Sequence, residues 1–164
     1  MKETPVVTTI VAVDPATAFA IFTEEIDRWW KPRVPRMFCK DHAGSLRFET
    51  GGSGRLVEVH GDGVTEIGKI LVWSPPERLV FGWREADFGA GETTEVEVRF
   101  ERVVRGTRVT VEHRGWERLP ADHVSRRGYT GDAFRSMIGL RWADLVVTFR
   151  LACSERSGAQ ATIT

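Results

Sequence analysis

The chain has 164 residues, of which 41% are hydrophobic and 28% charged, as expected for one soluble globular domain with a sizeable core. Its 23 lysines and arginines balance its 23 aspartates and glutamates, so charge gives no reason to expect binding to nucleic acid or to an anionic membrane surface. No apolar run approaches the roughly 20 residues of a membrane-spanning helix, and the charged start of the chain does not look like a signal peptide.

The N-terminal part predicts a strand followed by two short helices. Residues 6–13 are rich in Val, Thr and Ile, which favour strands. Asp14 then supplies a helix N-cap and Pro15 the first helical position, and apolar residues recur after them at helical spacing. A second helical turn covers about residues 25–30 and ends before Pro32.

Six further strands follow, because the period of the apolar residues changes from helical to alternating. Glycine-rich turns separate most of them, and a Pro-Pro pair joins two of them, since proline has no N–H with which to continue a ladder. The expected strands are residues 46–49, 55–60, 64–73, 78–84, 93–104 and 107–115.

The last two strands predict a sheet with one covered face. A two-residue turn at Arg105-Gly106 places Arg99 opposite Glu112. Glu97 then falls on the charged face, where we expect it to be solvated. The apolar face carries Val96, Val98, Phe100, Val109, Val111 and His113.

The strands on either side of the Pro-Pro turn differ in where they place their tryptophans. If Trp73 lies opposite Arg78, then Gly68 lies opposite Trp83 and leaves room for its ring. Trp83 then shares the apolar face, whereas Trp73 falls on the outer face or the rim.

The C-terminal segment predicts the helix that covers the apolar face. We expect this helix to start after Gly131 and to run to about Ala152. Residues 1–154 then form a single domain, and residues 155–164 a flexible tail. The helical stripe consists of Phe134, Ile138, Trp142, Leu145 and Phe149.

Several short motifs follow one another in a characteristic order. They are Asp14-Pro15, Trp29-Trp30 before Pro32, Gly52-Xaa-Gly54-Arg55, Gly68-Lys69-Ile70, Trp73-Ser74-Pro75-Pro76, Arg78-Leu79, Trp83, residues 107–112 and Gly115-Trp116-Glu117. This order resembles the START-like helix-grip (SRPBCC) superfamily, and within it the group similar to the Hsp90 ATPase activator homologue domain. The resemblance implies an α+β fold, in which a curved antiparallel seven-stranded sheet wraps on a long C-terminal helix around an apolar cavity, with two short helices after the first strand.

The candidate ligand-binding residues are an aromatic wall and three other side chains near it. His113, on the apolar face, is suited to holding a polar group or to acid–base chemistry, and Arg141 to holding a carboxylate in a bidentate pair. Plain core packing, a core histidine and a rim arginine stay open as alternatives. The full set is Trp29, Trp30, Phe38, Phe48, Trp83, His113, Met137 and Arg141.

No metal or cofactor is expected. The two cysteines, Cys39 and Cys153, and the four histidines have no metal-ligand spacing. Reduced thiols fit a cytoplasmic protein. The cluster from Gly51 to Gly54 lacks the lysine and the following helix of a phosphate-binding loop.

These observations favour binding of a small hydrophobic or aromatic molecule between the sheet and the C-terminal helix. Two alternatives stay open, and both come from the resemblance: a polyketide cyclase or hydratase that uses His113, and a chaperone-interaction module. A protein partner or a homodimer is compatible with each of them.

Overall fold

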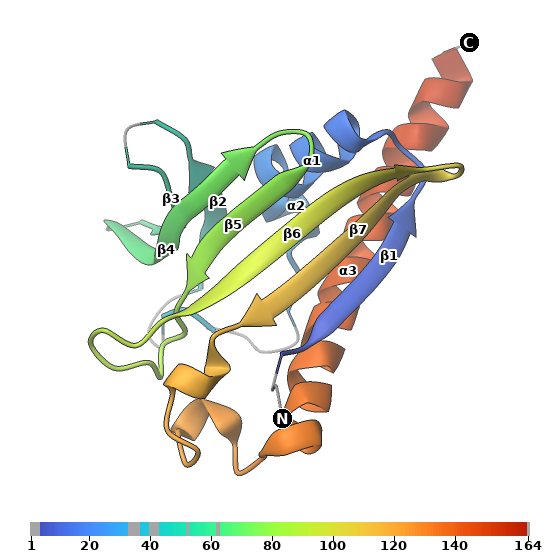
Figure 1. Cartoon of the computed structure of the whole chain (residues 1–164). Helices are drawn as coiled ribbons and strands as arrows, with labels where there is room; N and C mark the ends of the chain where they lie inside the picture. The colour runs from blue at the N-terminus through green and yellow to red at the C-terminus, as the bar shows by residue number, and fades with distance from the viewer. Residues whose placement is uncertain (1–3, 33–36, 40–42, 52, 62, 164) are drawn as a thin grey trace.

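The computed structural model describes residues 4–32, 37–39, 43–51, 53–61 and 63–163, the last five by their backbone alone (Figure 1). The strands are β1 (Val6–Val11), β2 (Ser45–Glu49), β3 (Arg55–His60), β4 (Gly63–Ser74), β5 (Arg78–Trp83), β6 (Thr94–Val103) and β7 (Gly106–Arg114). The helices are α1 (Pro15–Glu24), α2 (Ile26–Trp29) and α3 (Gly131–Ile163), with short 3-10 helices η1 (Trp116–Arg118) and η2 (Val124–Arg126) before α3.

The strands form one antiparallel sheet in the order β1-β7-β6-β5-β4-β3-β2. Figure 1 shows the sheet curled, with α3 crossing behind β7 and β1 and with α1 and α2 on the same side. The predicted helix-grip α+β fold is therefore confirmed. No helix in the described ranges is both long and apolar enough to cross a membrane.

Local chemistry explains why α1 starts where it was expected to start. The Asp14 carboxylate accepts a hydrogen bond from the Thr17 N–H (2.7 Å), and Pro15 occupies the first turn. The cap satisfies a backbone donor that has no partner within the helix. The indole of Trp29 then donates to the Ile21 carbonyl (3.1 Å), which fixes α2 against α1.

The register of β6 and β7 differs from the prediction by two residues. The turn lies one residue earlier than expected, because Val103 pairs with Gly106, and Arg99 faces Thr110 rather than Glu112. Gly106 has φ +139°, and a Cβ there would lie 2.1 Å from the Val11 carbonyl oxygen, so this glycine serves the contact with β1. An even shift keeps every side chain on its predicted face.

A β-bulge in β4 overturns the predicted outer face of Trp73 but leaves its side chain at the rim, 37% exposed. The register shifts between Ile70 and Val72, so Trp73 pairs with Leu79 and not with Arg78. Trp73 therefore lies on the concave face, where its ring meets that of Phe19 edge-on with centroids 5.2 Å apart. An extra residue in a strand reverses the alternation beyond it.

The close approach of two backbones explains Gly68, whose expected role was to leave room for the Trp83 ring. A Cβ on Gly68 would lie only 1.9 Å from the Gly82 carbonyl oxygen. Here β4 passes directly against β5, so the space is needed by the main chain.

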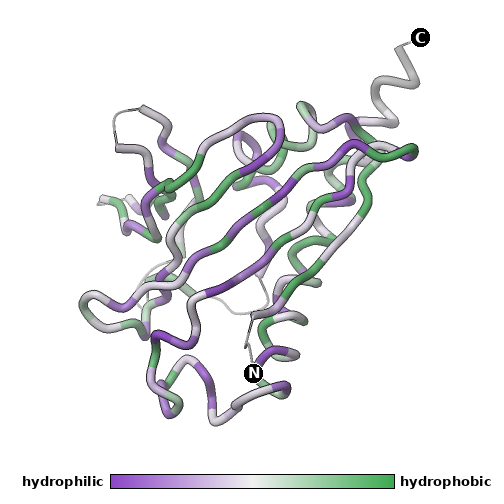
Figure 2. The backbone as a smooth tube through the Cα atoms, in the orientation of Figure 1, coloured by the Kyte–Doolittle hydropathy of each residue, from purple (hydrophilic) through white to green (hydrophobic). Residues whose placement is uncertain are grey.

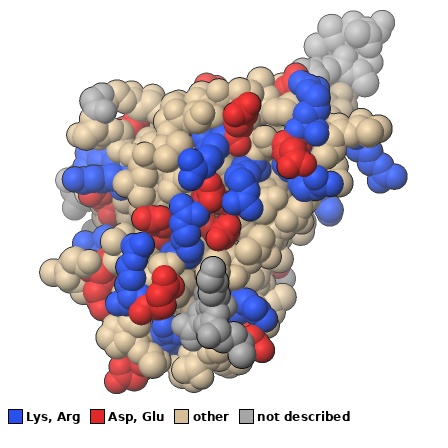
Figure 3. Space-filling view, in the orientation of Figure 1, with Lys and Arg blue, Asp and Glu red and all other residues tan. Residues whose placement is uncertain are grey.

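The outer face of the sheet carries an ion-pair network, and Glu97 lies buried within it. The prediction of a solvated Glu97 is wrong, because its side chain is only 7% exposed. Its carboxylate accepts from Arg78, from Arg99 (3.1 Å) and from Arg114 (2.7 Å). Burial alone would raise the pKa of Glu97, but the hydrogen bonds from Arg78 and Arg114 outweigh it and lower that pKa. Figure 3 shows basic and acidic side chains interleaved over the middle of this face.

The helix α3 is longer than expected, since it continues to Ile163 rather than ending near Ala152. Two ion pairs connect this extension to the α1–α2 region. They join Glu155 to Arg28 (2.9 Å) and Arg156 to Glu25.

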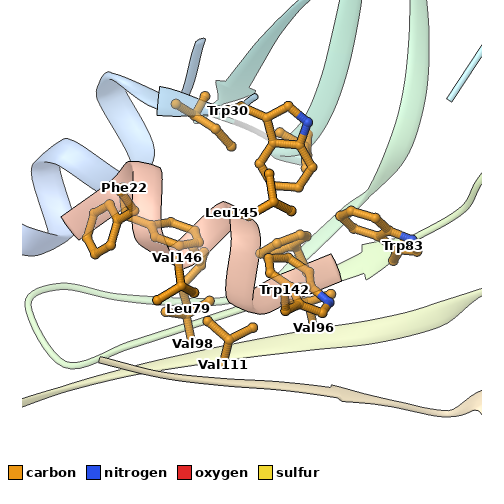
Figure 4. Close-up of a cluster of buried hydrophobic side chains, with 14 of the residues drawn as sticks. Phe22, Trp30, Leu79, Trp83, Val96, Val98, Val111, Trp142, Leu145 and Val146 are labelled. Atoms are coloured by element: carbon orange, nitrogen blue, oxygen red, sulfur yellow. The ribbon is translucent and has the colours of Figure 1, made fainter. Parts of the chain in front are cut away.

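The core lies between α3 and the concave face (Figure 4). The predicted stripe of α3 is buried over its whole length, from Phe134 to Phe149. In Figure 4, Trp142 and Val146 point from the helix toward the strands, and Leu145 points toward Trp30. Figure 2 shows hydrophobic and hydrophilic residues alternating along the strands, as one buried face requires. The buried strand residues include Leu79, Phe81, Val96, Val98, Val109 and Val111.

The two glycines Gly68 and Gly139 should respond in opposite ways to alanine. Gly68→Ala forces β4 away from β5, and we expect it to lower the free energy of unfolding by about 1–3 kcal/mol. Gly139→Ala meets no atom within 4 Å in α3 and should raise it by about 0.5–1 kcal/mol through helix propensity. Urea denaturation of both variants checks this, and equal effects of the two changes would contradict the proposed backbone contact.

Candidate functional site

A small enclosed void lies between the concave face of the sheet and α3. Its volume is about 10 Å³, which is room for about one water molecule. Pockets that bind small molecules usually measure about 300–1,000 Å³. The interior is therefore packed in this conformation. The lining residues are Met37, Trp83, His113, Ile138, Arg141, Trp142 and Leu145.

His113 is the polar centre of this region, and its two ring nitrogens have different partners. The Trp142 indole Nε1 lies 3.0 Å from Nδ1 of His113, and Thr94 Oγ1 lies 2.8 Å from its Nε2. An indole N–H can only donate, so Nδ1 must be the acceptor and the proton must reside on Nε2. The Thr94 hydroxyl can then donate onward to the Trp83 carbonyl (3.3 Å). The imidazole is thus assigned as neutral.

The surroundings of His113 favour this neutral form. The residue is 1% exposed, and its ring lies 4.7 Å from that of Trp116 and 5.3 Å from that of Trp83, centroid to centroid. Burial lowers the pKa of His113 well below its usual value, and the nearby charge of Arg141 lowers it further.

A charged pair closes one side of the void. Arg141 Nη2 on α3 forms an ion pair with Glu85 Oε1 (3.1 Å) and donates a hydrogen bond to the Met37 sulfur (3.3 Å). The other Glu85 oxygen accepts from the Trp83 indole (3.0 Å). The Arg141 and Glu85 side chains are 20% and 12% exposed, so this pair stands at the rim between the interior and solvent.

The structure brings three of the predicted site residues together at the void: Trp83, His113 and Arg141. Trp30 and Phe38 stand directly behind them, with ring centroids 5.8 Å and 5.0 Å from that of Trp83. In Figure 4, Trp30 lies next to Leu145 of α3 and Trp83 lies beside Trp142, whose ring contacts both tryptophans (5.8 and 5.4 Å).

The other three predicted residues lie away from the void. Trp29 packs against Trp30 in the next layer of the core (5.6 Å). Phe48 contacts Phe81 (5.3 Å) at the far part of the sheet. Met137 is partly buried on α3 and packs against the core without lining the void.

The prediction missed Met37, Glu85 and Trp142 as site residues. Trp142 belonged to the predicted helical stripe, and only its hydrogen bond to His113 distinguishes it from a core residue. Glu85 lies past the end of β5 and past the expected strand, where alternation no longer gives the direction of a side chain. Nothing in the sequence marks Met37.

The described part of the chain contains no cluster of side chains suited to a metal ion. Both cysteines are free, and Cys153 is buried. Burial raises the pKa of the Cys153 thiol to about 12, so this thiol stays protonated near neutral pH.

The neutral state of His113 predicts a loss of stability in mild acid. The unfolded chain binds a proton on this side chain below about pH 6.5, while the folded chain does not. The free energy of unfolding is therefore unaffected by this group above that pH and decreases below it. The decrease is about 1.4 kcal/mol at one pH unit below the pKa of the unfolded chain. Urea denaturation between about pH 7.5 and pH 5.5 measures this loss. His113→Gln should remove this part of the pH dependence, whereas equal slopes for both proteins would argue against a buried neutral imidazole.

A family model described as "Activator of Hsp90 ATPase homolog 1-like protein" matches residues 12–137 of the chain. No curated protein matches the sequence.

Several solved structures are similar over almost the whole chain. Protein MLL2253 from Mesorhizobium loti has a TM-score of 0.64 and 17% identity, covering 93% of this chain and 97% of its own. The Aha1 dimer from Colwellia psychrerythraea has a TM-score of 0.57 and 14% identity, covering 92% and 95%. CalC from Micromonospora echinospora, titled a self-sacrificing resistance protein, has a TM-score of 0.61 and 26% identity, covering 93% and 94%.

Proposed function

Because this chain belongs to the Activator of Hsp90 ATPase homolog 1-like family, a group of helix-grip domains, we propose that it binds a hydrophobic or aromatic small molecule between the sheet and α3. One observation carries the proposal. Trp83, His113 and Arg141 meet at one enclosed void, where aromatic surface, a neutral imidazole and a cation are all within reach of one small molecule.

The polar groups suggest what such a molecule carries. Arg141 can form a bidentate pair with a carboxylate or a similar anion, in exchange for its present contact with Glu85. The indole N–H of Trp116, which packs on His113, is buried and has no hydrogen-bond partner among the described residues. A ligand acceptor or a water molecule would satisfy this donor. We therefore infer an aromatic ligand with an acidic group.

Binding requires the interior to open, since the void holds about one water molecule. Met37 is suited to move first, because its unbranched side chain covers the void and has several rotatable bonds. Displacement of apolar side chains costs free energy that burial of the ligand must exceed, at about 25 cal/mol per Å² of apolar area.

One of the similar proteins, CalC, is described without reference to a chaperone. CalC is titled a resistance protein, and it is 26% identical to this chain over nearly its full length. The enzyme alternative has weaker support, because both nitrogens of His113 already have partners within the protein. The chaperone alternative draws its support from the family description alone.

A fluorescence titration with 1-anilinonaphthalene-8-sulfonate tests the proposal, because this probe combines an aromatic body with an anionic group. We expect saturable binding, with energy transfer from the interior tryptophans. Arg141→Met should weaken it by about tenfold or more through loss of a charge-assisted hydrogen bond.

Arg118→Met is the matched control, since Arg118 is exposed on the outer side of the molecule and its loss should leave binding unchanged. Equal losses in the two variants, or no saturable binding across the probe and a panel of aromatic acids, would overturn the proposal.

A further inference from the structure

The sheet has two edges, and they differ in how they are protected. Proteins usually guard an exposed edge strand with charged residues or proline, because its free backbone groups can pair with another chain. The edge strand β2 carries Arg47 and Glu49. The other edge strand, β1, has the sequence VVTTIV, with neither a charge nor a proline. By this criterion β1 is open to pairing.

The backbone of β1 has groups available for such pairing. Alternate residues turn their backbone toward β7, beginning with Pro5, whose carbonyl accepts from the His113 N–H (3.1 Å). The intervening residues therefore direct their N–H and C=O groups to the side away from β7. These residues are Val6, Thr8 and Ile10.

Two surface grooves follow this edge, which Figure 1 shows lying beside α3. One has a volume of about 550 Å³ and is lined by five consecutive residues of the β1 segment, 8–12, together with Arg105, Arg108 and Arg150. The other measures about 500 Å³ and is lined by Pro5, Val6 and Val7, with Arg135, Ser136, Gly139 and Leu140 of α3 opposite. Because successive residues point to opposite faces of a strand, a groove that touches them all runs along the strand's edge.

The charged residues that the structure describes in the lining of the two grooves are all arginines. Among the described residues, Arg105, Arg108, Arg135 and Arg150 line the two grooves and no carboxylate does. Arg108 pairs with Glu101 (2.6 Å) and Arg135 with Asp132 (2.9 Å). Within the described ranges, Arg105 and Arg150 take part in no ion pair. Figure 3 shows basic side chains around the tip of the β6–β7 hairpin, where Arg105 lies.

We propose that β1 is a docking edge for an extended acidic segment of a partner protein, which pairs with β1 as an eighth strand. Backbone pairing supplies affinity, and alternate side chains supply selectivity. On the outer side the segment meets Val6 (55% exposed) and Ile10 (42%). On the α3 side it meets Arg135 and Arg150. The fitting sequence therefore alternates acidic and apolar residues.

A second copy of this chain fits the edge less well. Pairing of β1 with β1 of another copy would bring the same four arginines of both copies to one interface, where the lining residues that the structure describes include no carboxylate. Like charges placed together disfavour a contact. The docking edge is also separate from the void, so it does not depend on the proposed binding of a small molecule.

A peptide of seven alternating Glu and Val residues, with blocked ends and a fluorescent label, tests the proposal by anisotropy. We expect binding that weakens as salt increases, and no binding of the matched peptide with Lys in place of Glu. The double variant Arg105→Glu/Arg150→Glu should lower the affinity at least tenfold. Arg47→Glu, at the other edge of the sheet, should not change it.

Amide hydrogen exchange locates the contact. The amides of Val6, Thr8 and Ile10 should exchange more slowly when the peptide is bound, while those of Val7 and Thr9, already directed to β7, should not change. The proposal would be overturned if the peptide did not bind at millimolar concentration or if the Lys peptide bound equally well. It would also be overturned if the bound peptide slowed the exchange of amides other than those of β1. A dimer of the free protein, measured by sedimentation, that already protects these three amides would overturn it as well. None of these results bears on binding of the sulfonate probe at the void, so a failure of the docking proposal is distinguishable from a failure of the proposed function.

Discussion

The hydrogen bond from the Trp142 indole to Nδ1 of His113 joins α3 to the concave face of the sheet. Thr94 holds the other ring nitrogen, so one imidazole connects β6, β7 and the helix. An imidazolium has no free acceptor, and protonation would break this connection. The arrangement therefore requires a neutral ring, which burial among tryptophans ensures. It also places Trp142 where a cavity was expected, and so leaves the interior packed.

Much of the fold follows from the sequence because it depends on patterns with a fixed period. Alternation identified the covered face of β6 and β7 even though the turn was misplaced, since a shift of two residues changes no side chain's face. The β-bulge near Leu71 shifts the register by one residue, and an odd shift does change the faces of the side chains beyond it. One extra residue moved Trp73 to the concave face, and no glycine or proline marks that position. Past Ala152, α3 places Glu155 and Arg156 in ion pairs with the α1–α2 region, and no apolar stripe of the sequence marks these contacts.

The candidate site was predictable in part, for the same physical reason. Strand alternation and the helical stripe placed Trp83, His113 and Arg141 on surfaces that face each other. Periodicity gives the direction of a side chain, but not what it touches. Met37 comes from an irregular segment, and Glu97 is buried because three arginines lie over it. The volume left between packed rings likewise depends on rotamers, which no sequence pattern encodes.

The proposed binding of a ligand between the sheet and α3 must work against the packing centred on His113, so the protonation state of this ring is the central claim of the account. Nitrogen-15 NMR of the imidazole measures it directly. The account predicts a neutral ring with its proton on Nε2 at about pH 7, unchanged down to about pH 5.5, below the usual pKa of a histidine. A ring that becomes doubly protonated near pH 6.5, or one that carries its proton on Nδ1 at neutral pH, would contradict it.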